Sequence, residues 1–369
     1  MSKPAIAPPP VKPARRRLFV VLAVSLPFLL LVAGLALGEM GCRLIMHFKH
    51  GVPGKRYGIY QGDAELGATH RPHAYNSNTV LNNHGLRNRE DAGPKRPGAL
   101  RVYCSGGSTT FCYNLPTDEA WPSVLQRELR KLAGHEQDEV LNAGQITWSL
   151  CHEFVLAKRL LPQLKPDFVV LFTGVNEGMS AEQFERKEPG KLDRLLAEQR
   201  WGEVAKDLDQ ARFLKRHSAL MKLWDYRLKA WFAPRLTQDY VDYNQVALTE
   251  PPKSHPTMHP YVMANLEHTL RAYLKFIREQ GATPVILRYG DNGSDGWYMK
   301  FGTRVWRERV VEIGRAEGAL ICDAAAVFER HPQRKDCFIE SGIHVTTLGA
   351  AVLAEELRKM LLEAATTKP

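Results

Sequence analysis

The chain has 369 residues, which is too long for one small domain and short for three. Its hydrophobic fraction of 44% is ordinary for a globular protein, so a sizeable core can form. Part of the formal net charge of +10 is a cluster of five basic residues before the first apolar run: Lys3, Lys12, Arg15, Arg16 and Arg17. The remaining excess is scattered among acidic residues on a solvated surface. Part of the positive charge therefore belongs to a membrane-flanking tail, and the charge does not indicate a nucleic acid as partner.

Residues 18–38 form an unbroken uncharged run, LFVVLAVSLPFLLLVAGLALG. As a helix, this run is long enough to cross about 30 Å of hydrocarbon, and a membrane tolerates Pro27 better than water does. The arginines before the run and Glu39 after it predict a cytoplasmic tail over residues 1–17, by the positive-inside rule. We therefore expect a single-pass protein of the inner (cytoplasmic) membrane, with a cytoplasmic N-terminus and everything after about residue 40 extracytoplasmic.

Two other interpretations of this N-terminus stay open. A cleaved signal peptide is one, since residues 36–38 (Ala-Leu-Gly) could serve as a cleavage site. Against it, signal peptides have apolar regions of about 7–15 residues, and this run is longer. A lipoprotein modified at Cys42 is the other, but Glu39 and Met40 are poor residues ahead of a lipidated cysteine.

The region between the anchor and the main domain, residues 39–99, has two parts. The anchor helix is expected to continue through Glu39–Phe48. Residues 51–99 are rich in Gly, Asn, His and Pro and show little periodicity. This composition predicts an extended membrane-proximal linker that packs onto the following domain.

From residue 100 onward, short apolar runs alternate with helical patterns. The expected strands are Arg101–Cys104, Glu139–Asn142, Phe168–Phe172, Thr283–Leu287 and Ala319–Cys322. The expected helices lie near Glu119–Leu132, Leu150–Leu161, Tyr261–Gln280, Thr303–Gly314 and Thr347–Leu362. Such alternation implies a parallel sheet covered on both faces. We predict an α/β domain over residues 100–365, a flavodoxin-like three-layer αβα sandwich with a parallel five-stranded sheet, interrupted by a charged helical insertion at about 180–258.

A serine, an asparagine and a histidine occur in an order that indicates ester chemistry. Ser108 stands on a tight Gly-rich turn directly after the first expected strand, where an α/β fold exposes a nucleophile. Asn176 follows the third strand, and His344 precedes the last helix. A serine hydroxyl needs a neighbouring base, for which histidine is suited, and the tetrahedral intermediate needs hydrogen-bond donors. The set predicts acyl transfer or ester hydrolysis.

In these segments the chain resembles the SGNH (GDSL-like) hydrolase superfamily. The residues Gly106-Gly107-Ser108-Thr109-Thr110 match its first block, and Gly174-Val175-Asn176-Glu177 match its third. The second block is matched in part by Asn142–Thr147, and the fifth only at His344. The segment Asn83–Arg87 is similar to the one that precedes the serine block in membrane-anchored members.

The resemblance implies a role for each matched position. Ser108 would be the nucleophile, and His344 the general base and acid. The Ser108 N–H and the Asn176 side-chain amide would bind the oxyanion. The family's third donor, a glycine N–H, falls at Thr147, with Gly144 as a second candidate.

The chain departs from the family at the acidic residue. The aspartate three residues before the histidine is Ser341 here, and Glu340 lies one position away. Glu340 could replace the aspartate only if the loop bends differently, and a Ser–His dyad is the alternative. Trp148, beside the second block, is a candidate substrate contact that could equally be buried.

The resemblance implies an SGNH-type serine esterase that acts on O-acyl esters, such as acetyl esters, of a carbohydrate or a lipid through an acyl-Ser108 intermediate. No cofactor is implied. A polysaccharide O-acyltransferase would use the same nucleophile. A degraded domain that binds glycan or a partner without turnover is the third possibility, because Ser341 and Thr147 depart from the family pattern.

The cysteines and acidic loops give weaker signals. The six cysteines show no Cys-x-x-Cys spacing, so we expect no zinc or other metal site. An extracytoplasmic location would permit a disulfide between Cys112 and Cys151. The Gly-rich loop with Asp291, Asn292 and Asp295 forms either a plain turn or a cation site.

Overall fold

The computed structural model describes residues 13–50, 55–174, 176, 177, 194, 198, 200, 260–294 and 304–366. Nearly all of the insertion predicted at about 180–258 lies outside these residues, so its helical character stays a prediction.

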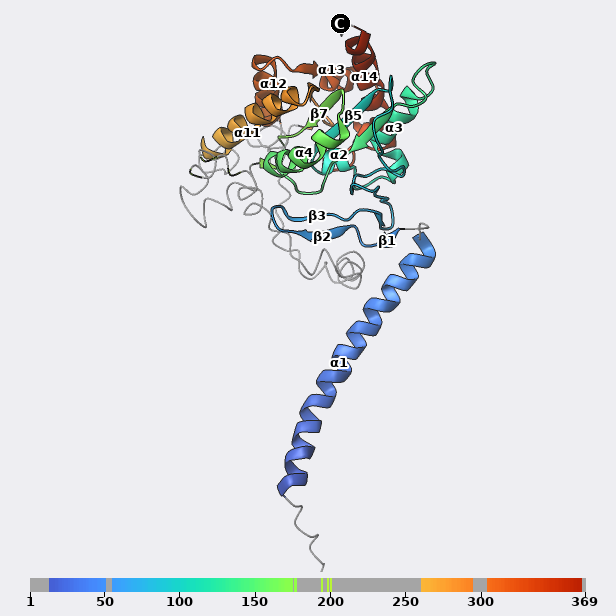
Figure 1. The fold of residues 1–369 in the computed structure, drawn as a ribbon, viewed down its shortest axis with the longest axis vertical. Coiled ribbons are helices and arrows are strands. Elements are labelled where there is room, and N and C mark those ends of the chain that lie inside the picture. The colour runs from blue at the N-terminus through green and yellow to red at the C-terminus, as the bar shows by residue number, and fades with distance from the viewer. Residues whose placement is uncertain are drawn as a thin grey trace, which may run out of the picture.

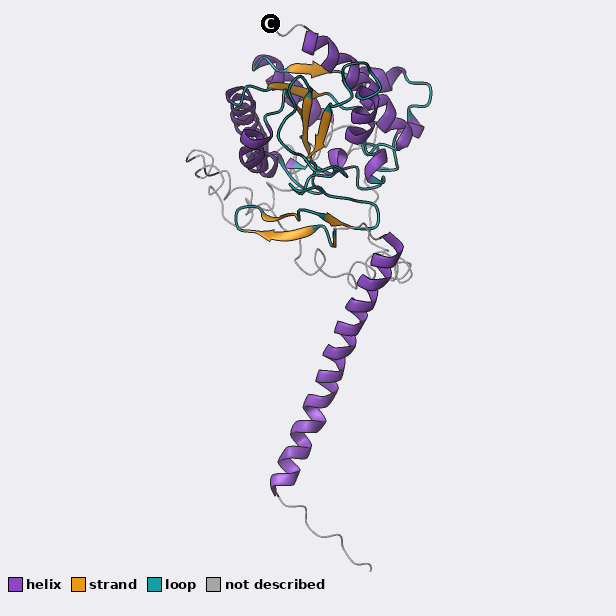
Figure 2. Ribbon diagram, turned by 45° about the vertical axis from the view of Figure 1, so that its right-hand side comes forward, coloured by secondary structure: helices purple, strands orange, loops and turns teal. Residues whose placement is uncertain are grey.

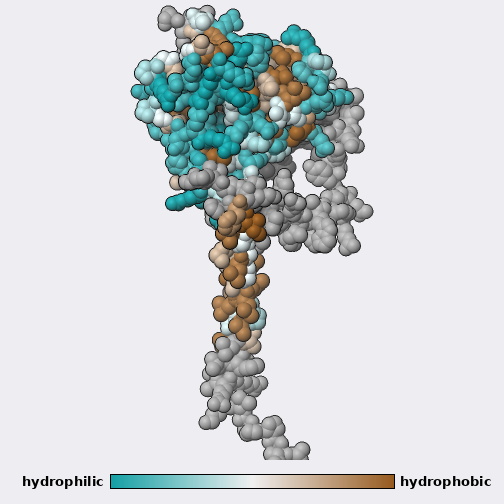
Figure 3. Space-filling model, turned by 90° about the vertical axis from the view of Figure 1, so that its right-hand side faces the viewer, coloured by the Kyte–Doolittle hydropathy of each residue, from teal (hydrophilic) through white to brown (hydrophobic). Residues whose placement is uncertain are grey.

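The N-terminal helix α1, Pro13–His50, leaves the globular part as one long rod (Figure 1). It contains the apolar run and the expected continuation to Phe48. Within it, Ser25–Ile45 is long and apolar enough to cross a membrane. Apolar side chains lie exposed along the rod, which Figure 3 shows in brown. Such a surface is unfavourable in water, so α1 needs an apolar surrounding.

The centre of the globular part is a five-stranded parallel sheet with the order β6-β5-β7-β8-β9. The strands are β5 (Arg101–Gly106), β6 (Glu139–Asn142), β7 (Phe168–Phe172), β8 (Thr283–Leu287) and β9 (Leu320–Cys322). This result confirms the predicted α/β fold with a parallel sheet. In chain order the strands run 2-1-3-4-5, so the order reverses between β5 and β7. Ligands of such folds bind at that point, beyond the carboxyl ends of the strands.

Alternate residues of the central strands face two separate apolar clusters. Tyr103 and Val169 pack into one cluster, while Val102 and Val170 pack into the other. The first cluster lies under α4 (Leu150–Leu164), α11 (Pro260–Glu279) and α12 (Val305–Ala316). The second lies under α3 (Trp121–Leu129), α13 (Ala324–Arg330) and α14 (Thr347–Thr366). Both faces of the sheet are therefore covered, which is why its strands are continuously apolar.

The membrane-proximal segment forms two small sheets between α1 and the main domain (Figure 2). The strands are β1 (Arg56–Tyr57), β2 (Tyr60–Asp63), β3 (Gly67–His70) and β4 (Ala74–Tyr75). Ile59 and Leu81 pack against Phe111 of the main domain, and Arg159 of α4 contacts Asp63 at 2.6 Å. The segment packs on the domain as its composition predicts, but its short strands were not expected because they carry no clear alternation.

The proposed disulfide is not formed. All six cysteines are free, and Cys112 and Cys151 contact different neighbours. The Cys112 thiol donates to the Thr109 carbonyl at 3.3 Å, whereas Cys151 lies beside Thr269 of α11 at 3.5 Å. Both are buried, and burial raises the pKa of each thiol, to about 11 and about 12 respectively.

Candidate active site

Ser108 begins a four-residue helix, α2 (Ser108–Phe111), at the carboxyl end of β5. The two glycines before it let neighbouring atoms come very close to the backbone of this turn. A Cβ on Gly106 would lie 2.1 Å from Thr110 Oγ1, and one on Gly107 would lie 2.6 Å from Asn176 Nδ2. Any side chain at these positions would push the turn apart. The glycines therefore let Ser108 sit where the β5 and β7 loops meet.

His344 reaches Ser108 from a loop 236 residues further along the chain. Its Nε2 lies 2.8 Å from Ser108 Oγ, which is hydrogen-bond distance. The loop that carries it is closed by a bond from the Ile339 N–H to the His344 carbonyl, 2.9 Å. Gly342, with φ +80°, makes the turn between them. The pairing predicted for Ser108 and His344 is thus present in the geometry.

The other ring nitrogen of His344 contacts Ser341, not Glu340. Ser341 Oγ lies 2.7 Å from Nδ1 and also accepts the His344 backbone N–H at 3.4 Å. The Glu340 side chain is exposed and lines a separate surface pocket with Lys335. The idea that Glu340 replaces the missing aspartate is therefore corrected. The loop keeps the usual three-residue spacing, and this spacing gives the position beside Nδ1 to Ser341.

The imidazole is neutral at physiological pH in this environment. Burial lowers the pKa of His344 to about 4, because a charged imidazolium loses water without gaining a carboxylate. A neutral imidazole with its proton on Nδ1 donates to Ser341 Oγ and accepts the Ser108 hydroxyl proton on Nε2. This is the tautomer that a general base for Ser108 requires.

Asn176 lies in the loop after β7, and its Nδ2 is close to Gly107, the residue before Ser108. One hydrogen of its Nδ2 goes to the Trp148 carbonyl at 2.8 Å. A primary amide has two N–H donors, so one remains for an oxyanion. The Ser108 N–H, at the first position of α2, has no partner within its own helix. The donors predicted at Asn176 and Ser108 therefore each keep an N–H free near the serine turn.

The loop after β6 distinguishes the two candidates for the third donor. Gly144 donates its N–H to Asn142 Oδ1 at 3.0 Å, and a Cβ there would lie 2.3 Å from the Phe111 nitrogen. Because this N–H is already bonded inside the protein, the prediction of Gly144 as an oxyanion donor is corrected. Thr147 is exposed and has φ +67°, a left-handed conformation that favours glycine. Across the part of the chain that the structure describes, its N–H meets no acceptor. The backbone at Thr147 thus has a conformation that usually belongs to glycine, and its N–H stays free for a ligand.

Trp148 is not a substrate contact. Its side chain is only 2% exposed and stacks on His152 with ring centroids 5.5 Å apart. Only its backbone reaches the site, through the carbonyl that holds Asn176. Its place beside the second block predicts a contact with substrate, but the loop turns the ring toward His152 of α4.

An aromatic residue that the sequence did not reveal lies at the site instead. Tyr113 packs edge-on against His344, with ring centroids 4.8 Å apart, and is 39% exposed. Leu348, 36% exposed, is the other large apolar residue exposed in the described globular part. Asn114 Nδ2 donates to the Val345 carbonyl at 2.9 Å, so the segments of Tyr113 and Leu348 are adjacent. Tyr113 thus gives the site an exposed aromatic edge beside the base.

Two buried carboxyl groups lie beneath the site. Glu177 accepts the Leu150 N–H at 2.8 Å, and Glu153 accepts from Ser105 at 3.1 Å and Thr173 at 3.3 Å. Burial raises the pKa of both, and that of Glu153 rises well above the usual range with a further contribution from Glu177. These bonds fix the ends of β5 and β7, and with them the loops of Ser108 and Asn176.

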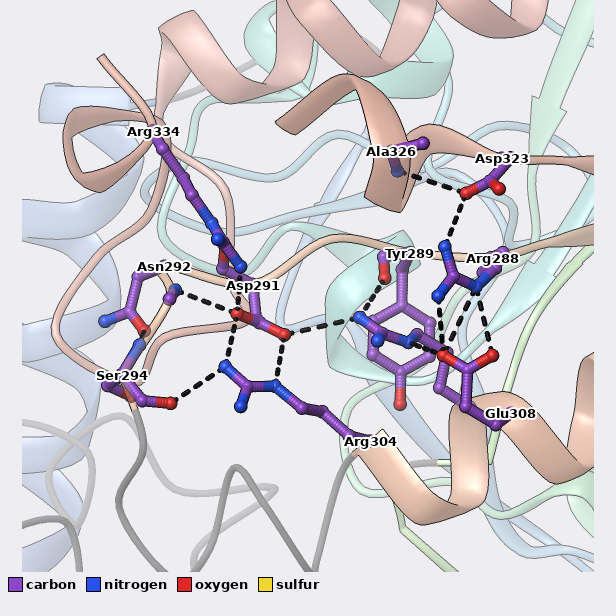
Figure 4. A network of polar contacts seen from close by, with 12 residues as sticks. Arg288, Tyr289, Asp291, Asn292, Ser294, Arg304, Glu308, Asp323, Ala326 and Arg334 are labelled. Atoms are coloured by element: carbon purple, nitrogen blue, oxygen red, sulfur yellow. Dashed lines mark hydrogen bonds and ion pairs between the residues drawn. The ribbon is translucent and has the colours of Figure 1, made fainter. Parts of the chain in front are cut away.

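An arginine cluster around Asp291 holds the loop after β8 (Figure 4). Asp291 is buried and receives hydrogen bonds from Arg304 at 2.9 Å, Arg334 at 2.7 Å and Arg307 at 3.3 Å. Its neighbour Asn292 donates its N–H to the Gly342 carbonyl at 3.0 Å. Asp291 is thus part of a turn and is bonded to arginines. It is therefore not available as the main ligand of the alternative cation site. Asp295 lies outside the described residues.

No metal-binding group of three or more His, Cys, Asp or Glu side chains is present among the residues that the structure describes.

Comparisons with known proteins give similarity only at the level of solved structures. No protein-family model matches the chain, and no curated protein matches it. A putative lipolytic protein of the G-D-S-L family from Desulfitobacterium hafniense is 13% identical, with 70% of this chain and 98% of that one covered and a TM-score of 0.40. A lipase/acylhydrolase from Enterococcus faecalis is 14% identical, with coverage of 72% and 96% and a TM-score of 0.40. An acetylxylan esterase from Geobacillus stearothermophilus is 13% identical, with coverage of 70% and 93% and a TM-score of 0.42. The chain is similar to these proteins in its α/β fold, and its chemistry is argued from its own residues.

Proposed function

We propose that the chain is a membrane-anchored, extracytoplasmic serine esterase that cleaves O-acyl esters of a carbohydrate or a lipid. The observation that carries the proposal is the 2.8 Å contact between Ser108 Oγ and Nε2 of a neutral His344. A hydroxyl and an unprotonated imidazole in hydrogen-bond contact, beside unpaired amide donors, are the parts that acyl transfer needs.

The acylation step uses these parts in order. Ser108 Oγ attacks the ester carbonyl carbon while its proton moves to His344 Nε2. The carbonyl oxygen becomes an oxyanion beside the Ser108 N–H and the free N–H of Asn176, with the Thr147 N–H as third donor. Each such donor lowers the barrier by roughly 3 kcal/mol. The imidazolium then protonates the leaving alcohol oxygen as the carbon–oxygen bond breaks, which leaves acyl-Ser108.

Deacylation repeats the sequence with water. His344 Nε2 takes a proton from water, and the hydroxide adds to the acyl carbon. Ser108 Oγ leaves and recovers the proton from the imidazolium. Ser341 stabilises the imidazolium by accepting its Nδ1–H, but as a neutral hydroxyl it adds no opposite charge. We expect turnover to be slower than with an aspartate in this position.

The exposed Tyr113 and the predicted anchor support the proposed substrate class. The exposed Tyr113 ring suits the face of a sugar ring or an acyl chain, and no charged group is required for a neutral ester. The long apolar α1 favours substrates at the membrane, such as envelope glycans or lipids. An acetyl group is the acyl chain that the family resemblance favours for glycans.

The test uses the full-length chain in detergent micelles with p-nitrophenyl esters of increasing chain length. Ser108→Ala and His344→Ala should each lower kcat by at least about a thousandfold, because neither partner acts alone. Ser123→Ala, which removes a serine of α3 away from the site, should retain wild-type activity. A fluorophosphonate probe should modify Ser108 with loss of fluoride, and the phosphonylated peptide should be visible by mass spectrometry.

Equal activity of wild type and Ser108→Ala would refute the proposal. Failure of Ser108 to react with the probe, while the protein still binds glycan, would favour the binding module. Acyl groups found on an added polysaccharide rather than on water would instead identify a transferase.

A further inference from the structure

The helix that presents Ser108 is too short to hold its own shape. A single turn such as α2 is unstable without tertiary contacts, because few bonds repay the ordering of its residues. It also ends at Cys112 with φ +56°, a left-handed conformation that is unfavourable for a non-glycine residue. Something outside α2 must therefore hold its carboxyl end.

Buried side chains bind the carbonyl groups at this end one after another. Trp121 Nε1 donates to the Thr109 carbonyl at 3.2 Å, and Asn142 Nδ2 donates to that of Thr110 at 2.9 Å. The next two carbonyls, Phe111 and Cys112, both accept from Nη1 of Arg87.

Arg87 holds more of this turn than any other side chain described. Its Nη2 donates to the Leu115 carbonyl at 2.5 Å and to the Asn78 carbonyl at 3.2 Å, and its guanidinium lies 4.6 Å from the centre of the Phe111 ring. The side chain is fully buried, and in the described part of the chain no carboxylate lies within ion-pair distance. A cation at the carboxyl end of a helix also meets the negative end of its dipole.

Arg87 is itself held in place by contacts of its segment with β6. Its N–H donates to the Asn142 carbonyl at 2.8 Å, and the next residue, Asn88, bonds both Val140 and Asn142. The turn before it requires Gly85, with φ +73°, since a Cβ there would lie 2.8 Å from the His70 carbonyl.

The turn that Arg87 holds also contacts the base. Within residues 112–115, Tyr113 packs on the His344 ring and Asn114 bonds the Val345 carbonyl. The inner side of this turn is thus fixed by Arg87, and its outer side touches the histidine loop.

We infer that Arg87 is a positioning residue that sets Ser108 and His344 relative to each other through the turn at residues 112–115. The inference rests on the proposed function, in which these two residues are nucleophile and base. Arg87 touches neither substrate nor reacting atoms. Its two terminal nitrogens replace the missing helical turns of α2 with fixed donors to four carbonyl groups, those of Phe111, Cys112, Leu115 and Asn78. A lysine ammonium has only three N–H donors, all on one nitrogen, and cannot supply this set.

The test compares Arg87→Lys with a matched control, Arg101→Lys, in the full-length protein in detergent. Arg101 is equally buried and bonds the Leu164 and Gly93 carbonyls, but it lies at the far end of β5. Both variants should lose thermal stability. Arg87→Lys alone should slow fluorophosphonate modification of Ser108 by at least about tenfold per folded molecule and reduce kcat more than it raises KM, because small displacements of reacting groups are costly.

Two further measurements keep the inference testable. Hydrogen exchange at the amides of residues 110–115 should rise in Arg87→Lys and not in Arg101→Lys. Asn114→Ala, which leaves Arg87 in place, should slow Ser108 modification severalfold without large loss of stability. Equal modification rates in wild type and Arg87→Lys would overturn the inference. If wild type itself is not modified, the proposed function fails, and unchanged exchange at residues 110–115 would then separately overturn the positioning role.

Discussion

At the residue scale, the unusual feature is a histidine whose partner on Nδ1 is a hydroxyl. Ser341 fixes the ring orientation and the tautomer as a carboxylate would. It brings no negative charge, so nothing offsets the desolvation that lowers the pKa of His344 to about 4. Hydrogen bonds to an ionised partner are roughly twice as strong as those between neutral groups. The imidazolium is therefore less stabilised than beside a carboxylate, and the base stays unprotonated in mild acid.

This arrangement predicts an acid-tolerant enzyme. Esterase activity requires unprotonated His344, so kcat/KM should stay level from neutral pH down to about pH 5 and fall with a midpoint near the pKa of about 4. In Ser341→Asp the new carboxylate favours the imidazolium and raises its pKa. The midpoint should move upward by at least one pH unit, and kcat at pH 8 should increase about tenfold, the value of roughly 1.4 kcal/mol of added transition-state stabilisation.

The measurement is the pH dependence of kcat/KM for both proteins and for Ser341→Asn, a neutral variant of the same shape as Asp. Ser341→Asn should keep the low midpoint. A wild-type midpoint near 6.5, or the same midpoint in all three proteins, would contradict this account of His344.

At the element scale, some parts of the fold and site follow from the sequence and others do not. The strand bounds of Phe168–Phe172 and Thr283–Leu287 were predicted as observed, because a strand buried on both faces needs an unbroken apolar run. Ser108 and Asn176 follow β5 and β7, and His344 precedes α14, as their places in the sequence predict. The partner of Nδ1 and the place of Tyr113 were missed, since both depend on loop conformation. A left-handed residue such as Cys112 leaves no signal in composition.

The Asp291 cluster predicts a pH-dependent stability of the loop after β8. Burial alone would raise the pKa of Asp291, but hydrogen bonds from Arg304 and the Gly293 N–H, with the charges of Arg304 and Arg334, lower it to about 2. A lowered pKa stabilises the fold above the unfolded value near 4, and this contribution is lost as pH falls toward 2. Asp291→Asn leaves three arginines without their shared counter-charge and should destabilise the protein by about 3–5 kcal/mol at pH 7.

Thermal unfolding at pH 7 and pH 3 measures this effect. The difference in melting temperature between wild type and Asp291→Asn should be smaller at pH 3 than at pH 7. Asp323→Asn is the control, because Asp323 is half-exposed and caps α13 through the Ala326 N–H, so its loss should cost only about 1 kcal/mol. If the two variants are equally stable at pH 7, the cluster does not hold the loop.

At the scale of the whole molecule, a polar globular domain is joined to a long apolar helix. Exposed apolar side chains such as Phe28, Leu30 and Leu37 cover α1, whereas the described globular surface exposes few. One helix of this kind is compatible with a signal sequence as well as with a membrane span. The predicted anchor and the signal-peptide alternative differ in whether the mature chain keeps α1.

Cell fractionation and N-terminal sequencing separate the two. An anchored chain should stay in the membrane fraction through washes with high salt and alkaline carbonate, and dissolve only in detergent. Its N-terminal residues before the apolar run should be intact. A mature chain that begins after residue 38 and is found in the soluble fraction would rule out the anchor.

The distance between the end of the span and the first strand limits where the domain can work. Only the ten residues from 46 to 55 separate Ile45 from Arg56, and even fully extended they reach about 35 Å. In an anchored molecule this short connection keeps the globular domain within a layer only a few nanometres deep above the lipid. Esters carried by polymers that lie along the bilayer would be processed by lateral encounter, and the capacity of a cell for this reaction would scale with membrane area rather than with compartment volume.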